Sequence, residues 1–417
     1  MLFFRKLLYP NPKPFKIEIH SNSSANHPQQ DHLKMNRRSL LQQLSALSLG
    51  LAGTSQIAFA QQTAEKTKPS AKKKNTSKSL DLAWHNVEDF GLEGREWSDL
   101  KRLRYYDRFP AEVEKNIPVP VWSLSRDSAG MMARFQSDST TIAVRYTLRN
   151  ERLAMPHMPA TGASGTDLYA QDDKGTWRWV YCSQPTGKNV ETVLINGIPK
   201  QSREFQLYLP LYNGIEKLEI GTLKNAQFQG HAPRPKPLVF YGTSITHGAS
   251  ASRPGMVHTA ILGRRLNLPI LNLGFSGNGR MDTGVNEMMG KLDAAAYVID
   301  CLPNMGPELV TERTAPLVRQ LRSARPETPI ILVEDRRNTN SWILKSRDNF
   351  HTANHSALKN AYDSLIKSGV KNLYYINGDN LLGDDNDGTV DASHPTDLGF
   401  YRQALEMEPV IKKALAR

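Results

Sequence analysis

Leu238-Val239-Phe240-Tyr241-Gly242-Thr243-Ser244 is an apolar run that ends in a Gly-x-Ser turn. A short, continuous apolar run is typical of a strand that is buried on both faces of a sheet. Similar runs occur four more times in the C-terminal half: Ile270–Leu273, Ala296–Ile299, Ile330–Val333 and Leu373–Ile376. The sequence therefore predicts a buried sheet from residue 238 onward.

Helical patterns alternate with these strands at Met256–Leu266, Glu308–Arg322, His351–Lys367 and Leu398–Ala416. Strands that alternate with helices form right-handed βαβ units, in which helices cover both faces of a parallel sheet. We therefore expect an α/β domain at residues 233–417, in which helices cover both faces of a parallel sheet. Ligands of such sheets bind at the carboxyl ends of the strands, so a site is expected in the loops that follow them.

The preceding part of the chain has a different pattern. Short β-prone runs occur at Ala129–Phe135, Thr141–Leu148, Trp177–Tyr181, Glu204–Leu209 and Ile215–Ile220. Turn residues separate them, which predicts a β-sandwich or jelly roll at residues 81–232. Trp177 and Trp179 fall on one face of their strand. We expect this pair to pack between sheets rather than to form an exposed glycan-binding surface.

The positive charge of the chain is concentrated at one end. The formal net charge is +12, but residues 1–80 carry 13 Lys and Arg against 3 Asp and Glu, which leaves 40 against 38 for the rest. A large phosphate-binding face needs many clustered cations. The nearly neutral body therefore argues against a nucleic-acid partner.

The basic end reads as an export signal. Met35 is followed by Arg37-Arg38, an apolar stretch that reaches Leu51, and Ala58-Phe59-Ala60. A positive start, a moderate apolar middle and a small-residue cleavage site describe a signal peptide at residues 35–60, and the Arg pair resembles a twin-arginine signal. The alternative is an amphipathic helix of the mature protein. We predict a periplasmic or extracellular protein.

The segments on either side of the predicted signal peptide, and the two cysteines, also have a predicted role. Residues 1–34 are interpreted as an over-extended N-terminus, and residues 61–80, rich in Gln, Thr, Lys and Ser, as a disordered linker. No apolar run after the signal approaches the ~18 residues that a membrane span needs, so we expect no integral membrane segment. We expect Cys182 and Cys301 to be buried free thiols.

Four loops at predicted strand ends carry polar or glycine residues. They contain Ser244, the glycines of residues 274–279, Asn304, and the Asp391/His394 pair. Taken singly, each has an ordinary structural explanation: a helix-capping Ser, a Gly-rich turn, a turn Asn, and a polar surface loop or half of a metal site. All four, however, fall where a parallel sheet places its ligands.

Together the residue types fit nucleophilic catalysis. A serine hydroxyl is a weak nucleophile and needs a base, and the base needs a carboxylate that holds its tautomer. Asp391 lies three residues before His394, so one loop could supply both. A metal is the weaker functional interpretation of this loop.

The order of these residues resembles the SGNH (GDSL-type) hydrolases, and this resemblance implies a three-layer, flavodoxin-like α/β domain at residues 233–417. The resemblance implies Ser244 as nucleophile, His394 as general base and acid, and Asp391 as its partner. It also implies an oxyanion hole formed by the backbone N–H groups of Ser244 and Gly277 and the side chain of Asn304. Two motifs depart from the commonest form: Gly-Thr-Ser replaces Gly-Asp-Ser, and Leu-Pro-Asn replaces Gly-x-Asn-Asp.

The N-terminal half resembles the β-rich GxDLY-type domain that precedes one branch of these hydrolases. The resemblance rests on Gly165-Thr166-Asp167-Leu168-Tyr169, with Leu92-Glu93-Gly94-Arg95 and Val121-Trp122-Ser123-Leu124-Ser125 upstream. It implies a carbohydrate esterase that removes acetyl groups from a polysaccharide or oligosaccharide. No metal or organic cofactor is expected. The alternatives are an esterase, lipase or acyltransferase that acts on a non-carbohydrate ester, and a non-catalytic glycan-binding protein.

Overall fold

The computed structural model describes residues 80–416. The predicted signal peptide, the interpreted over-extended N-terminus and all but the last residue of the predicted linker lie outside this range. Within it, no helix combines the length and the apolar character that crossing a membrane requires. Cys182 and Cys301 are both free and buried, which confirms the prediction for the two thiols.

A five-stranded parallel sheet organises the C-terminal part. Its strands, in spatial order, are β11 (Ile270–Gly274), β10 (Leu238–Gly242), β12 (Ala296–Asp300), β13 (Ile330–Val333) and β14 (Leu373–Ile376). In order of appearance along the chain this is 2-1-3-4-5, the flavodoxin-like order. The predicted α/β class and sheet are therefore confirmed.

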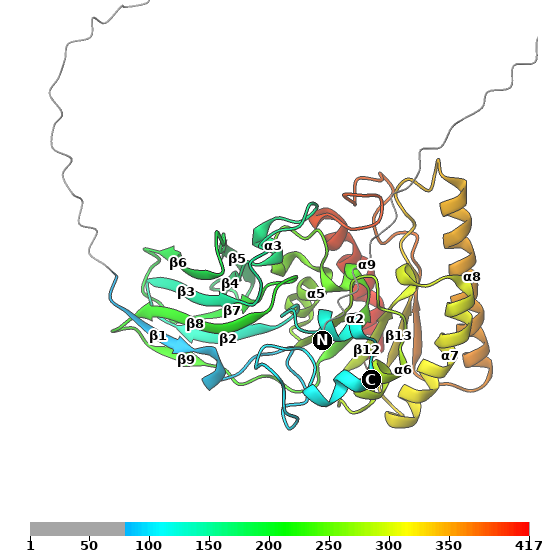
Figure 1. Ribbon diagram of the computed structural model, residues 1–417, viewed down its shortest axis with the longest axis horizontal. Helices are drawn as coiled ribbons and strands as arrows, with labels where there is room; N and C mark the ends of the chain where they lie inside the picture. The colour runs from blue at the N-terminus through cyan, green and yellow to red at the C-terminus, as the bar shows by residue number, and fades with distance from the viewer. Residues whose placement is uncertain (1–79, 417) are drawn as a thin grey trace, which may run out of the picture. The chain divides into compact units, whose positions relative to one another are not determined.

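Helices cover both faces of this sheet. Successive side chains of each strand point to opposite faces, and apolar side chains on both faces pack against helices. Leu238 and Phe240 of β10 pack with α5 (His258–Leu266) and α9 (Asp397–Leu415). Val239 and Tyr241 pack on the other face, in a core shared with three further helices. These are α6 (Thr283–Gly290), α7 (Pro307–Ala324) and α8 (Lys345–Lys367). Figure 1 shows α7 and α8 running alongside each other on the outside of the sheet.

The N-terminal part is a sandwich of two antiparallel sheets. One sheet has the order β1 (Leu82–Asn86), β8 (Ile215–Leu223), β3 (Thr141–Leu148) and β6 (Asn189–Asn196). The other has the order β5 (Trp177–Cys182), β4 (Asp167–Gln171), β7 (Arg203–Tyr208), β2 (Met132–Ser137) and β9 (Phe228–Gly230). Apolar residues of both sheets share one core, in which Val144 of β3 and Phe205 of β7 are fully buried. The predicted β-sandwich is confirmed.

Short helices occur between these elements. Two of them, α2 (Val119–Leu124) and α3 (Ala160–Ala163), lie in the N-terminal part, and α4 (Ser244–His247) follows β10. The 3-10 helices are Val87–Asp89, Ala111–Asn116, Pro254–Met256 and Leu302–Asn304.

The packing expected of the two tryptophans was wrong. Trp177 is only half-buried, and 49% of Trp179 is exposed. Their strand, β5, forms an edge of its sheet, and the pairing of β4 with β5 shifts register between Leu168 and Tyr169. The Trp179 ring lies under the Arg253 guanidinium, 4.7 Å from its centroid, instead of between the sheets.

The Gly165–Tyr169 motif joins the sandwich to the α/β part. Asp167 is fully buried, and its Oδ2 accepts hydrogen bonds from the Gly255 N–H (2.8 Å) and from Arg253 Nη1 (2.9 Å). Trp179 Nε1 donates to the other carboxylate oxygen at 2.8 Å. A buried carboxylate needs such partners to offset its desolvation. The motif therefore fixes the sandwich against the loop that precedes α5.

Candidate active site

Ser244 lies two residues after the end of β10, at the first position of the short helix α4. The Thr243 side chain caps this helix by accepting a hydrogen bond from the Ile245 N–H. Gly242 pairs with the last residue of each neighbouring strand, Gly274 of β11 and Asp300 of β12. Ser244 therefore stands at the carboxyl edge of the sheet, where the sequence places it, and 7% of the residue is exposed.

The structure brings together the three predicted catalytic residues. Ser244 Oγ lies 2.8 Å from His394 Nε2 across 150 positions of sequence. His394 Nδ1 lies 2.7 Å from Asp391 Oδ2. The three side chains thus form one chain of hydrogen bonds from hydroxyl to imidazole to carboxylate.

Local backbone bonds hold the Asp391–His394 loop in shape. Asp391 Oδ1 accepts the backbone N–H groups of Ser393 (3.1 Å) and His394 (2.7 Å), a turn that an Asp side chain commonly forms. Ala392 takes a positive φ of 70°, and the Val390 N–H donates to the His394 carbonyl at 3.0 Å. The carboxylate therefore positions both the ring and the backbone of His394.

The loop that follows β13 supports the Asp391–His394 loop. The Thr339 N–H donates to the Ala392 carbonyl at 2.9 Å, and the Thr339 and Thr389 hydroxyls lie 2.8 Å apart. These contacts attach the His394 loop to the sheet.

The predicted oxyanion-hole residues lie on the two loops next to Ser244. Gly277 follows β11 with a φ of +70°, and a side chain built there would meet open space. Asn304 follows β12, and its Oδ1 accepts the Gly279 N–H at 3.3 Å, which links the two loops. A Cβ on Gly279 would lie 2.0 Å from the Gly242 carbonyl oxygen, so only glycine fits against the strand that carries Ser244.

A buried ion pair lies beneath these loops. Arg336 binds Asp300 through two hydrogen bonds, Nη1–Oδ1 at 2.7 Å and Nη2–Oδ2 at 2.6 Å. Both side chains are inaccessible to solvent, and Thr246 Oγ1 donates to the same carboxylate at 3.3 Å. Burial raises the pKa of Asp300, an effect that Arg336 opposes. Asp300 is the last residue of β12, directly before the loop that carries Asn304. The ion pair therefore helps to hold the start of this loop in place.

One residue of the N-terminal part, His157, contacts the catalytic histidine, and this contact was not predicted from the sequence. The ring of His157 stacks near that of His394, with centroids 5.7 Å apart and planes inclined by 29°. Met155 and Met158 exchange backbone hydrogen bonds of 2.9 and 3.0 Å, so His157 sits in a tight hairpin turn. Nothing in the sequence signals a contact between positions 237 residues apart.

The electrostatics favour an ionised Asp391. Partial burial raises its pKa, but hydrogen bonds from the His394 backbone and ring and from the Ser393 N–H lower it more. The net pKa lies below the ordinary value. An ionised Asp391 accepts the Nδ1–H of His394, which leaves Nε2 free to take a proton from Ser244. The geometry is that of a base-activated nucleophile.

Comparisons with known proteins agree with this geometry. Residues 235–412 match the GDSL-like lipase/acylhydrolase family, and residues 82–228 match the GxDLY family, the N-terminus of SGNH-hydrolase-type esterases. A protein from Bacteroides ovatus described as a GDSL-like lipase is 34% identical, with a TM-score of 0.75. The match covers 80% of this chain and 98% of that one. The chain therefore belongs to the GDSL-like lipase/acylhydrolase family, a family of ester hydrolases, and both resemblances are confirmed.

More distant solved structures share the fold. A salicylyl acyltransferase from a tetracycline biosynthetic pathway has a TM-score of 0.63 at 17% identity, over 80% of this chain and 94% of that one. An acetyl xylan esterase from the rumen bacterium Butyrivibrio proteoclasticus has a TM-score of 0.50 at 11% identity, over 80% and 99%. The comparison with curated proteins finds no match.

Proposed function

We propose that this protein is an exported serine esterase that removes O-acyl groups, principally acetyl, from a carbohydrate. The observation that carries the proposal is the unbroken hydrogen-bond chain from Ser244 to His394 to Asp391. This is the arrangement that makes a serine hydroxyl nucleophilic near neutral pH.

Acylation begins when His394 Nε2 takes the Ser244 proton and Oγ bonds to the ester carbonyl carbon. Negative charge then develops on the former carbonyl oxygen, which the Ser244 and Gly277 N–H groups and the Asn304 amide are proposed to hold. As the C–O bond to the sugar breaks, His394 gives its proton to the departing sugar oxygen. Ser244 is left acylated.

Deacylation repeats these steps with water. His394 takes a proton from a water molecule, whose oxygen attacks the acyl carbon of Ser244. The second tetrahedral intermediate collapses, His394 returns the proton to Ser244 Oγ, and acetate leaves. Asp391 stabilises the imidazolium in both halves of the cycle.

A bulky polar substrate suits the exposure of the site. The side chains of His394 and Asp391 are 25% and 44% exposed, so the base lies at the surface rather than in a closed apolar tunnel. The substrate class is proposed from the resemblance of both halves of the chain to carbohydrate esterases. The acetyl xylan esterase from B. proteoclasticus supports it as a protein of the same fold.

Acetate release tests the proposal directly. We expect the purified protein to release acetate from an aryl acetate and from acetylated xylan or xyloglucan. Activity on the aryl acetate with none on any acetylated glycan would overturn the carbohydrate substrate and keep the esterase. An acylated acceptor alcohol formed in preference to free acetate would indicate an acyltransferase, and a longer acyl preference would indicate a lipase. A protein that binds glycan and hydrolyses no ester would overturn the enzyme itself.

Export is proposed from the leader at residues 35–60. Cleavage after Ala60 would leave Gln61 as the mature N-terminus. Sequencing the N-terminus of protein recovered from the periplasm or medium tests this. A mature chain that still begins at Met1 or Met35 would contradict it.

Replacing Asn304 by alanine is expected to lower kcat by roughly 10²–10³-fold, because one oxyanion donor is lost. KM should change little, since the charge on the oxygen develops only in the transition state. Steady-state kinetics on an aryl acetate measures both constants. An unchanged kcat would remove Asn304 from the oxyanion hole.

Replacing Asp391 by asparagine is expected to lower kcat on the order of 10⁴-fold, as for the equivalent change in another Ser–His–Asp enzyme. Because the pKa of Asp391 lies below its ordinary value, the carboxylate stays ionised from mildly acidic to neutral pH. The ratio of wild-type to variant kcat/KM should therefore be constant between about pH 5 and 8. A ratio that falls as the medium is acidified through this window would show that Asp391 takes up a proton there.

A further inference from the structure

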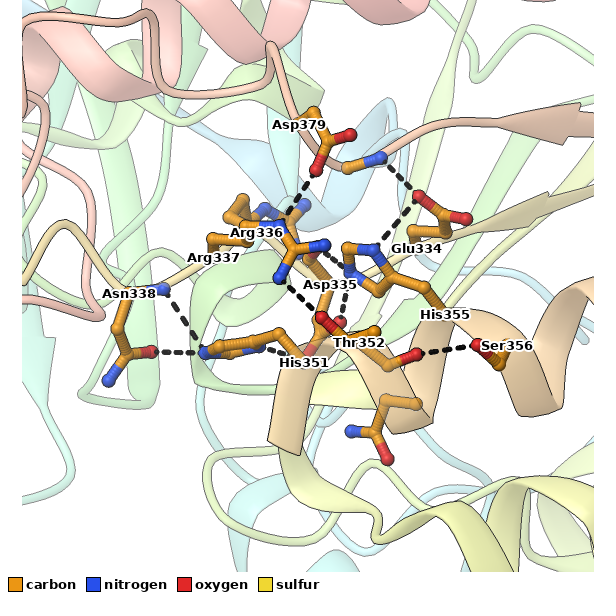
Figure 2. A network of polar contacts seen from close by, with 12 residues as sticks. Glu334, Asp335, Arg336, Arg337, Asn338, His351, Thr352, His355, Ser356 and Asp379 are labelled. Carbon is orange, nitrogen blue, oxygen red and sulfur yellow. Dashed lines mark hydrogen bonds and ion pairs between the residues drawn. The ribbon is translucent and has the colours of Figure 1, made fainter. Parts of the chain in front are cut away.

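Three potential metal ligands converge at the end of β13, on a cluster that the proposed mechanism does not use. Asp335 follows β13, and His351 and His355 lie one turn apart on α8. One ligand atom from each residue lies within 4.8 Å of the others. Figure 2 shows both rings turned toward the Asp335 carboxylate.

Each carboxylate oxygen of Asp335 faces a different ring nitrogen. Oδ2 lies 2.7 Å from His351 Nδ1, and Oδ1 lies 2.7 Å from His355 Nε2. Asp335 is fully buried, and the two histidines are 5% and 8% exposed. The cluster is therefore enclosed by protein, unlike an acidic patch on a surface.

One of these contacts is not satisfied as a hydrogen bond. His355 Nε2 lies 2.9 Å from the Asp335 carbonyl oxygen and bonds to it. Among the residues that the structure describes, none gives Asp335 Oδ1 a hydrogen bond, although His355 Nε2 is close to it. Asp335 Oδ1 is thus left with a 2.7 Å ion-pair contact to His355 Nε2 and no well-aligned hydrogen bond. A cation bound by both atoms would satisfy this buried oxygen.

The outer nitrogen of each ring has an acceptor of its own. His355 Nδ1 lies 3.3 Å from Glu334 Oε2. His351 Nε2 lies 3.1 Å from Asn338 Oδ1 and equally far from the Asn338 backbone N–H, so it has a partner in either tautomer. Histidines that bind a metal almost always donate their second N–H to a carboxylate or carbonyl oxygen. The outer contacts thus match those of a metal site.

We propose that Asp335, His351 and His355 bind a divalent transition-metal ion of the zinc type. Two imidazole nitrogens and both oxygens of one carboxylate would supply four donors, the number that zinc usually takes. Mg²⁺ and Ca²⁺ prefer sites made only of oxygen ligands, so the two histidines select against them. This inference reverses the expectation that the protein uses no metal.

The site would act as a structural brace. Arg336, adjacent to Asp335, binds Asp300 at the base of the Asn304 loop. Thr339, four residues beyond Asp335, binds the His394 loop. Fixing Asp335 would therefore hold the β13 loop that supports both halves of the candidate active site.

Cobalt binding tests the proposal without using catalysis. Wild-type protein stripped with a chelator is titrated with Co²⁺, whose visible absorption reports its ligands, and the bound metal is counted by mass spectrometry. We expect one Co²⁺ per chain, displaced by Zn²⁺. His351→Gln and His355→Gln should each weaken binding at least about tenfold, because even the partners of metal ligands contribute about 10–100-fold.

His231→Gln is the matched control. His231 pairs with Glu204 at 3.0 Å and belongs to no group of three potential metal ligands within residues 80–416, so its loss should leave Co²⁺ binding unchanged. If the ligand variants fail to fold, Asn338→Ala keeps the three ligands and should weaken binding about 10–100-fold. Zn²⁺ should also raise the Tm of the stripped wild type. Wild type that takes up no Co²⁺, or a His231→Gln loss as large as that of His355→Gln, would overturn the site. The ester-hydrolysis proposal stands or falls separately, because metal binding is read without substrate.

Discussion

Ser244→Ala is expected to lower kcat for acetate release on the order of 10⁶-fold, the loss seen when the nucleophile of another serine hydrolase is removed. The hydroxyl is the atom that bonds to the acyl group, so no neighbour can replace it. KM should stay near the wild-type value, since the backbone and side-chain groups proposed as oxyanion donors remain. Initial rates on an aryl acetate and on acetylated xylan measure the effect.

Ser250 provides a matched control for this change. It lies six residues from Ser244, is 7% exposed like Ser244, and its hydroxyl makes no hydrogen bond to any residue in the range 80–416. Ser250→Ala should therefore keep wild-type activity. His394→Ala should lose about as much as Ser244→Ala, and the double variant should lose no more, because the two residues act as a unit. Losses that multiply in the double variant would contradict the shared step.

Arg336→Met is expected to lower the free energy of unfolding by about 3–5 kcal/mol, because it leaves the Asp300 carboxylate buried without its cation. Urea unfolding near neutral pH measures the loss. Arg402→Met is the matched control: Arg402 also binds a carboxylate, that of Asp385, through two bonds of 2.7 Å, but this pair is partly exposed. Its loss should cost no more than about 1 kcal/mol.

The loss in Arg336→Met should also depend on pH. Burial already raises the pKa of Asp300, and removing Arg336 raises it further, so the folded state then favours the neutral acid. The destabilisation is therefore greatest above the folded-state pKa and shrinks as the pH falls toward about 4, the ordinary value for Asp. Equal losses in the Arg336 and Arg402 variants would show that burial of the pair has no energetic consequence.

The parallel sheet could be predicted because its strands are buried on both faces. All five strands begin at the residue where the apolar run predicts them. Several other elements were missed, among them β6 (Asn189–Asn196), and for two of them the physical reason is plain. Strand β4 opens with the fully buried Asp167, whose partners Arg253 and Gly255 are visible only in three dimensions. Helix α6 contains two glycines, which lower the local helix propensity.

The residues at strand ends could be predicted because strand order fixes where they meet. Ser244, Gly277 and Asn304 follow three adjacent strands, and the structure adds the distances. Contacts without a local pattern could not be foreseen, such as that of His157 with His394 or the pairing of Arg336 with Asp300. The Asp335, His351 and His355 cluster could be predicted only in part. His351 and His355 have ligand spacing in the sequence, but the inward turn of Asp335 is evident only in the fold.

Covalent labelling tests the central claim most directly. The protein is incubated with a fluorophosphonate, which reacts with activated serines, and the modified residue is located by peptide mass spectrometry. The account predicts one adduct per chain, on Ser244, present in Ser250→Ala and absent in Ser244→Ala. An adduct on another residue, or equal labelling of Ser244→Ala and wild type, would contradict Ser244 as the nucleophile.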